Sequence, residues 1–169
     1  MSEVFLSSAS WGLQELRNRI TEYLEAKGIQ VVRSESPGFY GSTTENRHDV
    51  CLRRVRDTSN YLLIIDRRAG SAYRGRNGQY RGLTVTHAEA KTAIEGEKRW
   101  DCFVRHEVWT CYQIWKYNHR GFWVRFDSID REVFRLLDDI DRKEMLTCQL
   151  FDNDKDILSQ LDGLSWVGT

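Results

Sequence analysis

Short apolar segments alternate with helical patterns along the chain, and this alternation is the feature that most constrains the fold. Residues 61–65 (YLLII) form a continuous apolar run, which is typical of a strand buried on both faces. Leu13, Leu16, Ile20 and Leu24 recur at the three- and four-residue spacing of a helix with one buried side. The alternation therefore indicates a parallel sheet with right-handed helical crossovers.

The expected elements can be placed by residue number. We predict strands at 3–8, 29–33, 61–66, 100–105 and 146–151, and helices at 13–27, 46–57, 83–93, 106–117, 130–141 and 154–161. A chain of 169 residues has the size of one domain with a single core. We expect one α/β domain over residues 1–169, with a three-layer, flavodoxin-like fold and a five-stranded parallel sheet in the order 2-1-3-4-5.

The charge of the chain excludes some classes of partner. It has 25 basic and 25 acidic residues, so it lacks the basic excess that attracts nucleic acids or anionic membranes. Residues 127–162 contain eleven acidic and five basic residues, which further argues against a nucleic-acid-binding domain. No apolar run approaches the ~20 residues of a membrane span, and the first ten residues do not resemble a signal peptide. We expect a cytoplasmic protein.

The carboxyl ends of the predicted strands are the expected place of a ligand site, because parallel sheets bind ligands where the strand order reverses. Segments 7–10, 35–44, 66–83 and 105–106 follow those ends. Segment 67–81 contains no acid and five arginines: Arg67, Arg68, Arg74, Arg76 and Arg81. It is either a solvated flexible loop or an anion clamp, mobile until a phosphate-bearing ligand joins its guanidinium groups.

Residues 83–93 (LTVTHAEAKTA) contain one carboxylate, Glu89, three positions after Thr86. Thr-x-x-Glu is the capping box, in which both side chains bind backbone N–H groups at a helix start. The same carboxylate could instead do chemistry beside the third strand. Ser7 and Ser8 have a similar ambiguity, because they either cap the first helix, form the polar end of the first strand, or line a binding site.

Four cysteines lie far apart, without the paired spacing of a zinc site: Cys51, Cys102, Cys111 and Cys148. We interpret them as reduced structural thiols and expect no bound metal. Cys102 and His106 would lie near the end of the fourth strand, which leaves a thiolate nucleophile as an alternative.

Several motifs resemble the domain-of-unknown-function 4062 family. VFLSSASWGLQELR is similar to the family's opening V-F-[IV]-S-S-T-F-x-D-L-x-x-E-R, and CLRRVRDTSNYLLIIDRRAGS to its C-L-x-x-[IV]…S-D-x-Y-[IV]-L-[IL]-[IL]-G-x-R-Y-G-S. Residues 84–93 resemble the motif S-[YI]-T-E-x-E-[YF]-x-x-A through Thr86, Glu89 and Ala93. VFRLLDDI and LFDNDKDILSQL resemble the closing segments.

This resemblance implies a TIR-like fold, related in architecture to nucleoside deoxyribosyltransferases. Such domains commonly occur in NTPase-containing proteins linked to bacterial defence or innate-immunity-like signalling. Active relatives of this architecture cleave N-glycosidic bonds of nucleotides, NAD among them, with a glutamate on the helix after the third strand. The resemblance thus implies NAD or another nucleotide as substrate, no cofactor, and self-association or a partner NTPase or effector.

On this reading Glu89 would be the catalytic carboxylate, because cleavage of a ribose C–N bond develops a cationic centre that a carboxylate stabilises or traps. The resemblance places the remaining candidates around the same nucleotide. Ser7 and Ser8 would line the ribose or phosphate side. Tyr40 would cover the base, and Asp66 is a second candidate acid. Arg68, Arg74 and Arg76 would hold the diphosphate.

A non-catalytic interaction or oligomerisation module remains an alternative function. Its support is the aromatic-rich segment 106–123, since aromatic residues are enriched at interfaces. The segment contains Trp109, Tyr112, Trp115, Tyr117, Phe122 and Trp123. The same residues would also suit the core.

Overall fold

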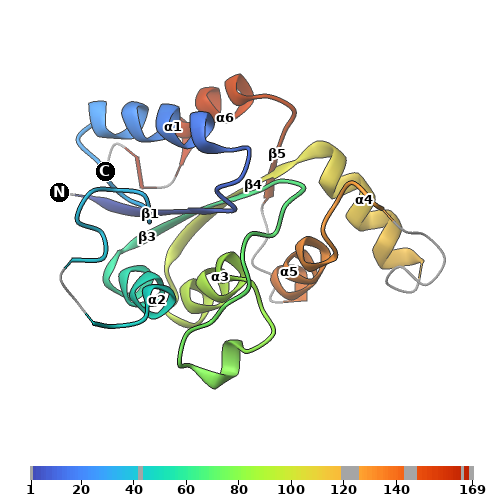
Figure 1. The fold of residues 1–169 in the computed structure, drawn as a ribbon. Helices are drawn as coiled ribbons and strands as arrows, with labels where there is room; N and C mark the ends of the chain where they lie inside the picture. Colours follow the sequence, from blue (N-terminus) through green and yellow to red (C-terminus); the bar gives the residue numbers. More distant parts are fainter. Residues whose placement is uncertain (1, 42–43, 119–125, 143–147, 165, 168–169) are drawn as a thin grey trace.

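The computed structural model contains one five-stranded parallel sheet with helices on both faces (Figure 1). The structure describes residues 2–41, 44–118, 126–142, 148–164 and 166–167. The strands are β1 (Glu3–Ser8), β2 (Gln30–Val32), β3 (Asn60–Ile65), β4 (Arg99–Arg105) and β5 (Cys148–Phe151). Their order is β2-β1-β3-β4-β5, and every neighbouring pair is parallel. The predicted α/β fold and strand order are confirmed.

The helices form the two outer layers. They are α1 (Gln14–Ala26), α2 (Arg47–Asp57), α3 (Val85–Glu95), α4 (His106–Tyr117), α5 (Arg131–Arg142) and α6 (Asp154–Gln160). Helices α1 and α6 cover one face of the sheet, and α2, α3 and α5 lie on the other, with α4 beside them (Figure 1). Among the described residues, no helix is long and apolar enough to span a membrane.

The two cores follow from the alternation of side chains along each strand. Val4 and Leu6 of β1 pack in the core beneath α1 and α6, while Phe5 between them packs in the core beneath α2 to α5. In β3 all six residues are buried, because this central strand has a helical layer on each side. Burial on both faces is the physical reason for the uninterrupted apolar run at residues 61–65.

Helix α3 (Val85–Glu95) begins earlier than a cap at Thr86 would allow. Thr84 is its N-cap, and the Thr84 hydroxyl accepts a hydrogen bond from the backbone N–H of His87 at 3.3 Å. Thr84 is held in an extended conformation by a bridge to Ala72, so the cap falls two residues before Thr86. The predicted capping box between Thr86 and Glu89 is therefore wrong, and the Glu89 carboxylate is available for another contact.

Ser7 and Ser8 belong to the end of β1 and not to a helix start. Helix α1 begins only at Gln14, and its N-cap residue Leu13 makes no side-chain capping bond. Of the two structural alternatives, the polar strand end is confirmed and helix capping is wrong, because the turn at residues 9–13 separates the serines from α1. Their position at the carboxyl end of a strand is the one that the sheet rule favours for a site.

The arginine-rich segment after β3 has structure of its own. The N–H of Tyr73 donates to the carbonyl of Leu83, and the N–H of Val85 donates to that of Ser71, each at 2.9 Å. Tyr73 and Tyr80 are buried against Leu52 and Ala88 of α2 and α3. Two backbone hydrogen bonds and two buried tyrosine rings therefore attach the segment to the rest of the domain. The tyrosines lie between the arginines in the sequence and supply the apolar surface that is buried.

The aromatic-rich segment contributes mainly to the core. Tyr112 and Trp115 of α4 are buried, and Trp109 packs against the same cluster. Tyr117 is 79% exposed at the helix end. Phe122 and Trp123 lie outside the described residues. Of the four aromatic residues of this segment that the structure describes, three therefore pack in or against the core, which agrees with one of the two interpretations of the sequence.

Candidate active site

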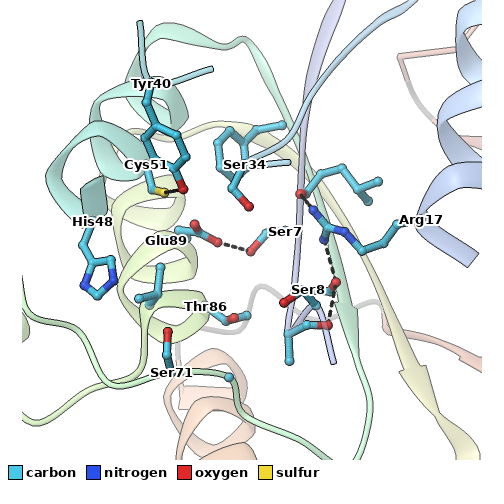
Figure 2. A pocket seen from close by; sticks show the side chains of 16 residues that line it. Ser7, Ser8, Arg17, Ser34, Tyr40, His48, Cys51, Ser71, Thr86 and Glu89 are labelled. Atoms are coloured by element: carbon cyan, nitrogen blue, oxygen red, sulfur yellow. Dashed lines mark hydrogen bonds between the residues drawn. The ribbon is translucent and has the colours of Figure 1, made fainter. Parts of the chain in front are cut away.

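A pocket lies at the carboxyl ends of β1 and β3, where the strand order reverses (Figure 2). Its cavity of about 130 Å³ exceeds the volume of a single water severalfold. It is lined by Phe5, Leu6, Ser7, Ser8, Ala9, Ser10, Arg17, Ser34, Tyr40, His48, Cys51, Gly70, Ser71, Val85, Thr86 and Glu89. Three predicted site residues of β1 and α3 meet here, Ser7, Ser8 and Glu89, and Tyr40 joins them.

The two serines of β1 face opposite layers because consecutive residues of a strand alternate. Ser7 points to the α3 side, where its hydroxyl donates to the Glu89 carboxylate at 2.5 Å. Ser8 points to the α1 side, where its hydroxyl accepts from Arg17 at 2.6 Å. One dipeptide at the strand end thus connects the helix after β3 with the helix after β1, across the pocket (Figure 2).

Glu89 is a buried carboxyl group, 5% exposed. Burial raises the pKa of Glu89 from its ordinary value of 4.5 to about 7, because a charged carboxylate loses water in the interior. The Ser7 hydrogen bond and the positive charge of Arg17 oppose this increase in the pKa. A carboxyl group with a pKa near neutrality, held in a pocket, is typical of a functional site.

Arg17 is a second charged group inside the site, 2% exposed. Its Nε and Nη2 donate to the two carboxylate oxygens of Glu35, at 2.6 and 2.7 Å, and Nη2 also donates to the carbonyl of Leu6. With the bond to Ser8, four of its five N–H groups have partners. Arg17 therefore supports the end of β1, with little donor capacity left for a ligand.

Glu35 provides the negative partner of Arg17 from the segment after β2. Burial raises the pKa of Glu35, but its hydrogen bonds with Arg17 and the charge of that residue outweigh the burial and leave the pKa below its usual value. The pair is therefore ionised at neutral pH. It fixes the geometry of Ser8 without adding net charge to the pocket.

A second wall of the pocket comes from α2 and the segment before it. Tyr40, His48 and Cys51 line this wall (Figure 2). The Tyr40 hydroxyl lies 4.0 Å from the Cys51 sulfur, and Arg47 lies over the Tyr40 ring. Burial raises the pKa of Tyr40 and of Cys51 to about 12 each. Both groups are neutral at physiological pH and present an uncharged, partly aromatic surface.

Gly70 brings backbone close to the site. Its φ of +83° lies in the left-handed region, and an added Cβ would lie 3.3 Å from the Thr86 hydroxyl and 3.6 Å from the Ala9 Cβ. A side chain here would be strained by its backbone conformation and would crowd the pocket. The turn after β3 therefore uses glycine to pass close to the start of α3.

The other predicted binding residues lie around the pocket and not in it. Arg68 pairs with Asp130 at 3.1 Å and lies over the Trp11 ring. The two carboxylate oxygens of Asp66 accept hydrogen bonds from Nε and Nη2 of Arg105, at 2.7 and 2.8 Å. Asp66, Arg68 and Trp11 line a neighbouring groove, which also includes Ala9 of the pocket.

Arg74 and Arg76 reach α2 through their backbones. The Arg74 N–H donates to Nδ1 of His48, and the Arg76 N–H donates to the Asp49 carboxylate. Within the part of the chain that the structure describes, Arg68, Arg74 and Arg76 are not among the residues that line the pocket. Their binding of a diphosphate stays a prediction.

Cys102 does not have the surroundings of a nucleophile. It is buried in β4 beside Cys148 of β5, and burial raises the pKa of its thiol well above the usual value. His106 lies at the start of α4 with its Nδ1 3.6 Å from Asp152. The alternative of a Cys102 thiolate is therefore wrong. Among the described residues, no group of three or more His, Cys, Asp or Glu could hold a metal ion.

Sequence reasoning missed three polar residues of the site: Arg17, Glu35 and His48. Only Arg17 had a local signal, because it interrupts the apolar side of α1 between Leu16 and Ile20. Glu35 and His48 depend on contacts with distant segments. Neither contact can be read from residue spacing.

Comparison with known proteins identifies a similar fold and the family of this chain. The structure of the CMP N-glycosidase BcmB of Clostridium botulinum is similar, with a TM-score of 0.54 and 11% sequence identity over 95% of this chain and 98% of that one. At this identity the similarity concerns the fold. No protein of curated function matches the sequence. Residues 3–162 match the domain of unknown function DUF4062, and the chain therefore belongs to the DUF4062 family.

Proposed function

We propose that this domain cleaves the N-glycosidic bond of a nucleotide, with Glu89 as the carboxylate at the reacting carbon. The observation that carries the proposal is the buried Glu89 carboxyl group, which accepts a hydrogen bond from the Ser7 hydroxyl at 2.5 Å. It lies in a pocket at the switch point of the sheet. A pKa of about 7 leaves a large ionised fraction at neutral pH. That fraction is poorly solvated, which makes it a strong partner for a developing cation.

The chemistry requires few groups. The C1′–N bond breaks, its electron pair leaves with the base, and C1′ becomes cationic in character. Ionised Glu89 stabilises or traps C1′, and water then supplies a hydroxyl to C1′ and a proton that balances the released base. Ser7 orients the carboxylate, because its hydroxyl donates to one carboxylate oxygen.

The similarity to a CMP N-glycosidase supports this reaction class, since the two folds correspond over nearly their full lengths. The pocket agrees with a nucleotide in its composition. Serine and threonine hydroxyls suit sugar and phosphate oxygens, and the Tyr40 side suits a planar base. NAD belongs to the same class of substrate, and a role in bacterial defence would follow from its consumption.

A nucleotide panel tests the proposal. The purified domain is incubated at low and high protein concentration with CMP, UMP, AMP, GMP and NAD, and the released base is separated by chromatography. We expect free base from at least one of them, and none from its carbocyclic analogue, in which C1′ cannot become an oxocarbenium ion. Absence of base release from all five, or release from the carbocyclic analogue, would refute the proposed function.

A non-catalytic interaction module is the second candidate. Its specific support is the end of α4, where Ile114 is 41% and Tyr117 is 79% exposed. Exposed apolar side chains three positions apart share one side of a helix, and such a surface suits self-association or a partner NTPase or effector. Sedimentation analysis of the wild type and Tyr117→Ser distinguishes this candidate, which predicts association that weakens in the variant.

A further inference from the structure

His48 is a polar residue of the pocket to which the proposed reaction assigns no task. It lies in the first turn of α2, where its own backbone N–H is bound by the side chain of the N-cap residue Asn46. Its ring packs beside the Tyr73 ring, with centroids 5.8 Å apart, and lines the pocket on the α2 side (Figure 2). The ring is thus held by contacts at its backbone and at one face.

A backbone contact determines the tautomer of His48. The N–H of Arg74 donates to Nδ1 of the ring at 2.8 Å, so Nδ1 has no proton. A neutral imidazole then carries its proton on Nε2, which is a hydrogen-bond donor. Protonation of Nδ1 would place two N–H groups against each other, which disfavours the charged ring.

The charges around His48 also favour the neutral ring on balance. Burial lowers the pKa of His48, the negative charge of Asp49 opposes this, and the positive charge of Arg74 adds to it; the net shift is downward. Glu89 of α3, with its pKa of about 7, lines the same pocket. A neutral donor on Nε2 is therefore the state that the surroundings support at physiological pH.

The two walls of the pocket differ in chemistry, and this difference indicates what the donor would meet. Ser8 and Arg17 lie on the β1 and α1 side, whereas Tyr40, Cys51 and His48 lie on the α2 side, with Glu89 and Ser7 between them (Figure 2). Sugar and phosphate oxygens fit the wall that carries the Ser8 hydroxyl, and a planar base fits the uncharged wall that carries the Tyr40 ring. His48 thus belongs to the wall that suits the base.

We propose that His48 binds the leaving nucleobase, by donating a hydrogen bond from Nε2 to a ring nitrogen or carbonyl oxygen of the base. The bond strengthens as the C1′–N bond breaks, because the base then receives the electron pair of that bond. No proton is transferred from the ring, and Nδ1 keeps its contact with Arg74 throughout. This inference rests on the proposed N-glycosidic cleavage and identifies the residue that acts on its leaving group.

Two substitutions distinguish the proposed donor, Nε2 of His48, from the contact of Nδ1 with the Arg74 N–H. His48→Asn places an amide oxygen near the position of Nδ1, so it retains an acceptor for Arg74 and loses the donor in the pocket. His48→Gln places an amide near the position of Nε2, so it retains the donor and loses the acceptor. Both variants are measured with the most active nucleotide of the panel and with a 4-nitrophenyl riboside 5′-phosphate, whose leaving group departs without a donor.

His48→Asn should lower kcat about tenfold for the nucleotide, the effect of one lost hydrogen bond, and change it less than about threefold for the nitrophenyl substrate. His48→Gln should stay within about threefold of the wild type on both substrates. Equal losses on both substrates, or a larger loss in His48→Gln than in His48→Asn, would overturn the proposal and leave His48 as an anchor for the segment after β3.

A binding measurement keeps this inference separate from the proposed function. If the wild type releases no base, calorimetry with CMP and with ribose 5-phosphate still tests the contact with the base. His48→Asn should weaken the binding of CMP about fivefold or more and leave that of ribose 5-phosphate unchanged. Equal weakening of both ligands, or no binding of CMP to the wild type, would refute a contact between His48 and the base.

Discussion

Glu89→Gln should stabilise the protein at alkaline pH, even though Glu89 is the proposed catalytic residue. The pKa of Glu89 is about 7 in the folded state, against an ordinary value of 4.5. A raised pKa means that the carboxyl group supports folding fully below pH 4.5, and that this support is lost as the pH rises through about 7. A shift of this size corresponds to about 3 kcal/mol at high pH, at about 1.4 kcal/mol for each pKa unit.

Glutamine removes this cost because it carries no charge and still accepts a hydrogen bond from Ser7. The free energy of unfolding of Glu89→Gln minus that of the wild type should therefore increase by about 2–3 kcal/mol between pH 5 and pH 8.5. Urea denaturation at several pH values measures it. Glu22→Gln, on the exposed side of α1, is the control for loss of one surface carboxylate. A difference that does not change with pH would refute the assignment of a raised pKa to Glu89.

Two other substitutions test the site and its supporting helix. Thr84→Ala should lower the free energy of unfolding by about 0.5–2 kcal/mol in urea denaturation, and Thr84→Ser should restore most of it, because Thr84 is the N-cap of α3; equal stability of the two variants would place the cap elsewhere. Arg17→Met should raise the pKa of Glu89 further, because the charge of Arg17 lowers it. Arg17→Lys should change it less. Carboxyl carbon NMR of Glu89 follows both titrations, and an unchanged midpoint in Arg17→Met would contradict the electrostatic coupling.

Much of the fold could be predicted because its signals are local. The apolar run at residues 61–65 reports a strand with a helical layer on each side, and the rules for crossovers then leave few strand orders. The same rules identified the edge of the sheet where Ser7 and Glu89 meet. The cap of α3 was misplaced because Thr84 and Thr86 are equally good candidates by sequence, and a bridge to Ala72 decides between them.

The roles of the arginines could not be predicted from composition. Counting positive charges in segment 67–81 suggested a clamp, but Arg67 pairs with Glu107 of α4, and Arg68 pairs with Asp130. Both acids lie far along the chain. In contrast, the sequence predicted no role for Arg17 beyond its match to the family's opening motif, although a charged side chain on an apolar helix face needs a partner of opposite charge. That partner is Glu35, and the ion pair holds Arg17 where it donates to the Ser8 hydroxyl.

The release of nucleobase by Glu89→Gln tests the central claim most directly. Glu95→Gln is the matched control, because it makes the same substitution on the same helix, at an exposed position where a side-chain acceptor for Tyr80 is retained. With the most active nucleotide of the panel, we predict that Glu89→Gln lowers the rate about a hundredfold or more, whereas Glu95→Gln stays near the wild type. A Glu89→Gln variant that is folded and releases base at the wild-type rate would contradict a catalytic role for this carboxylate.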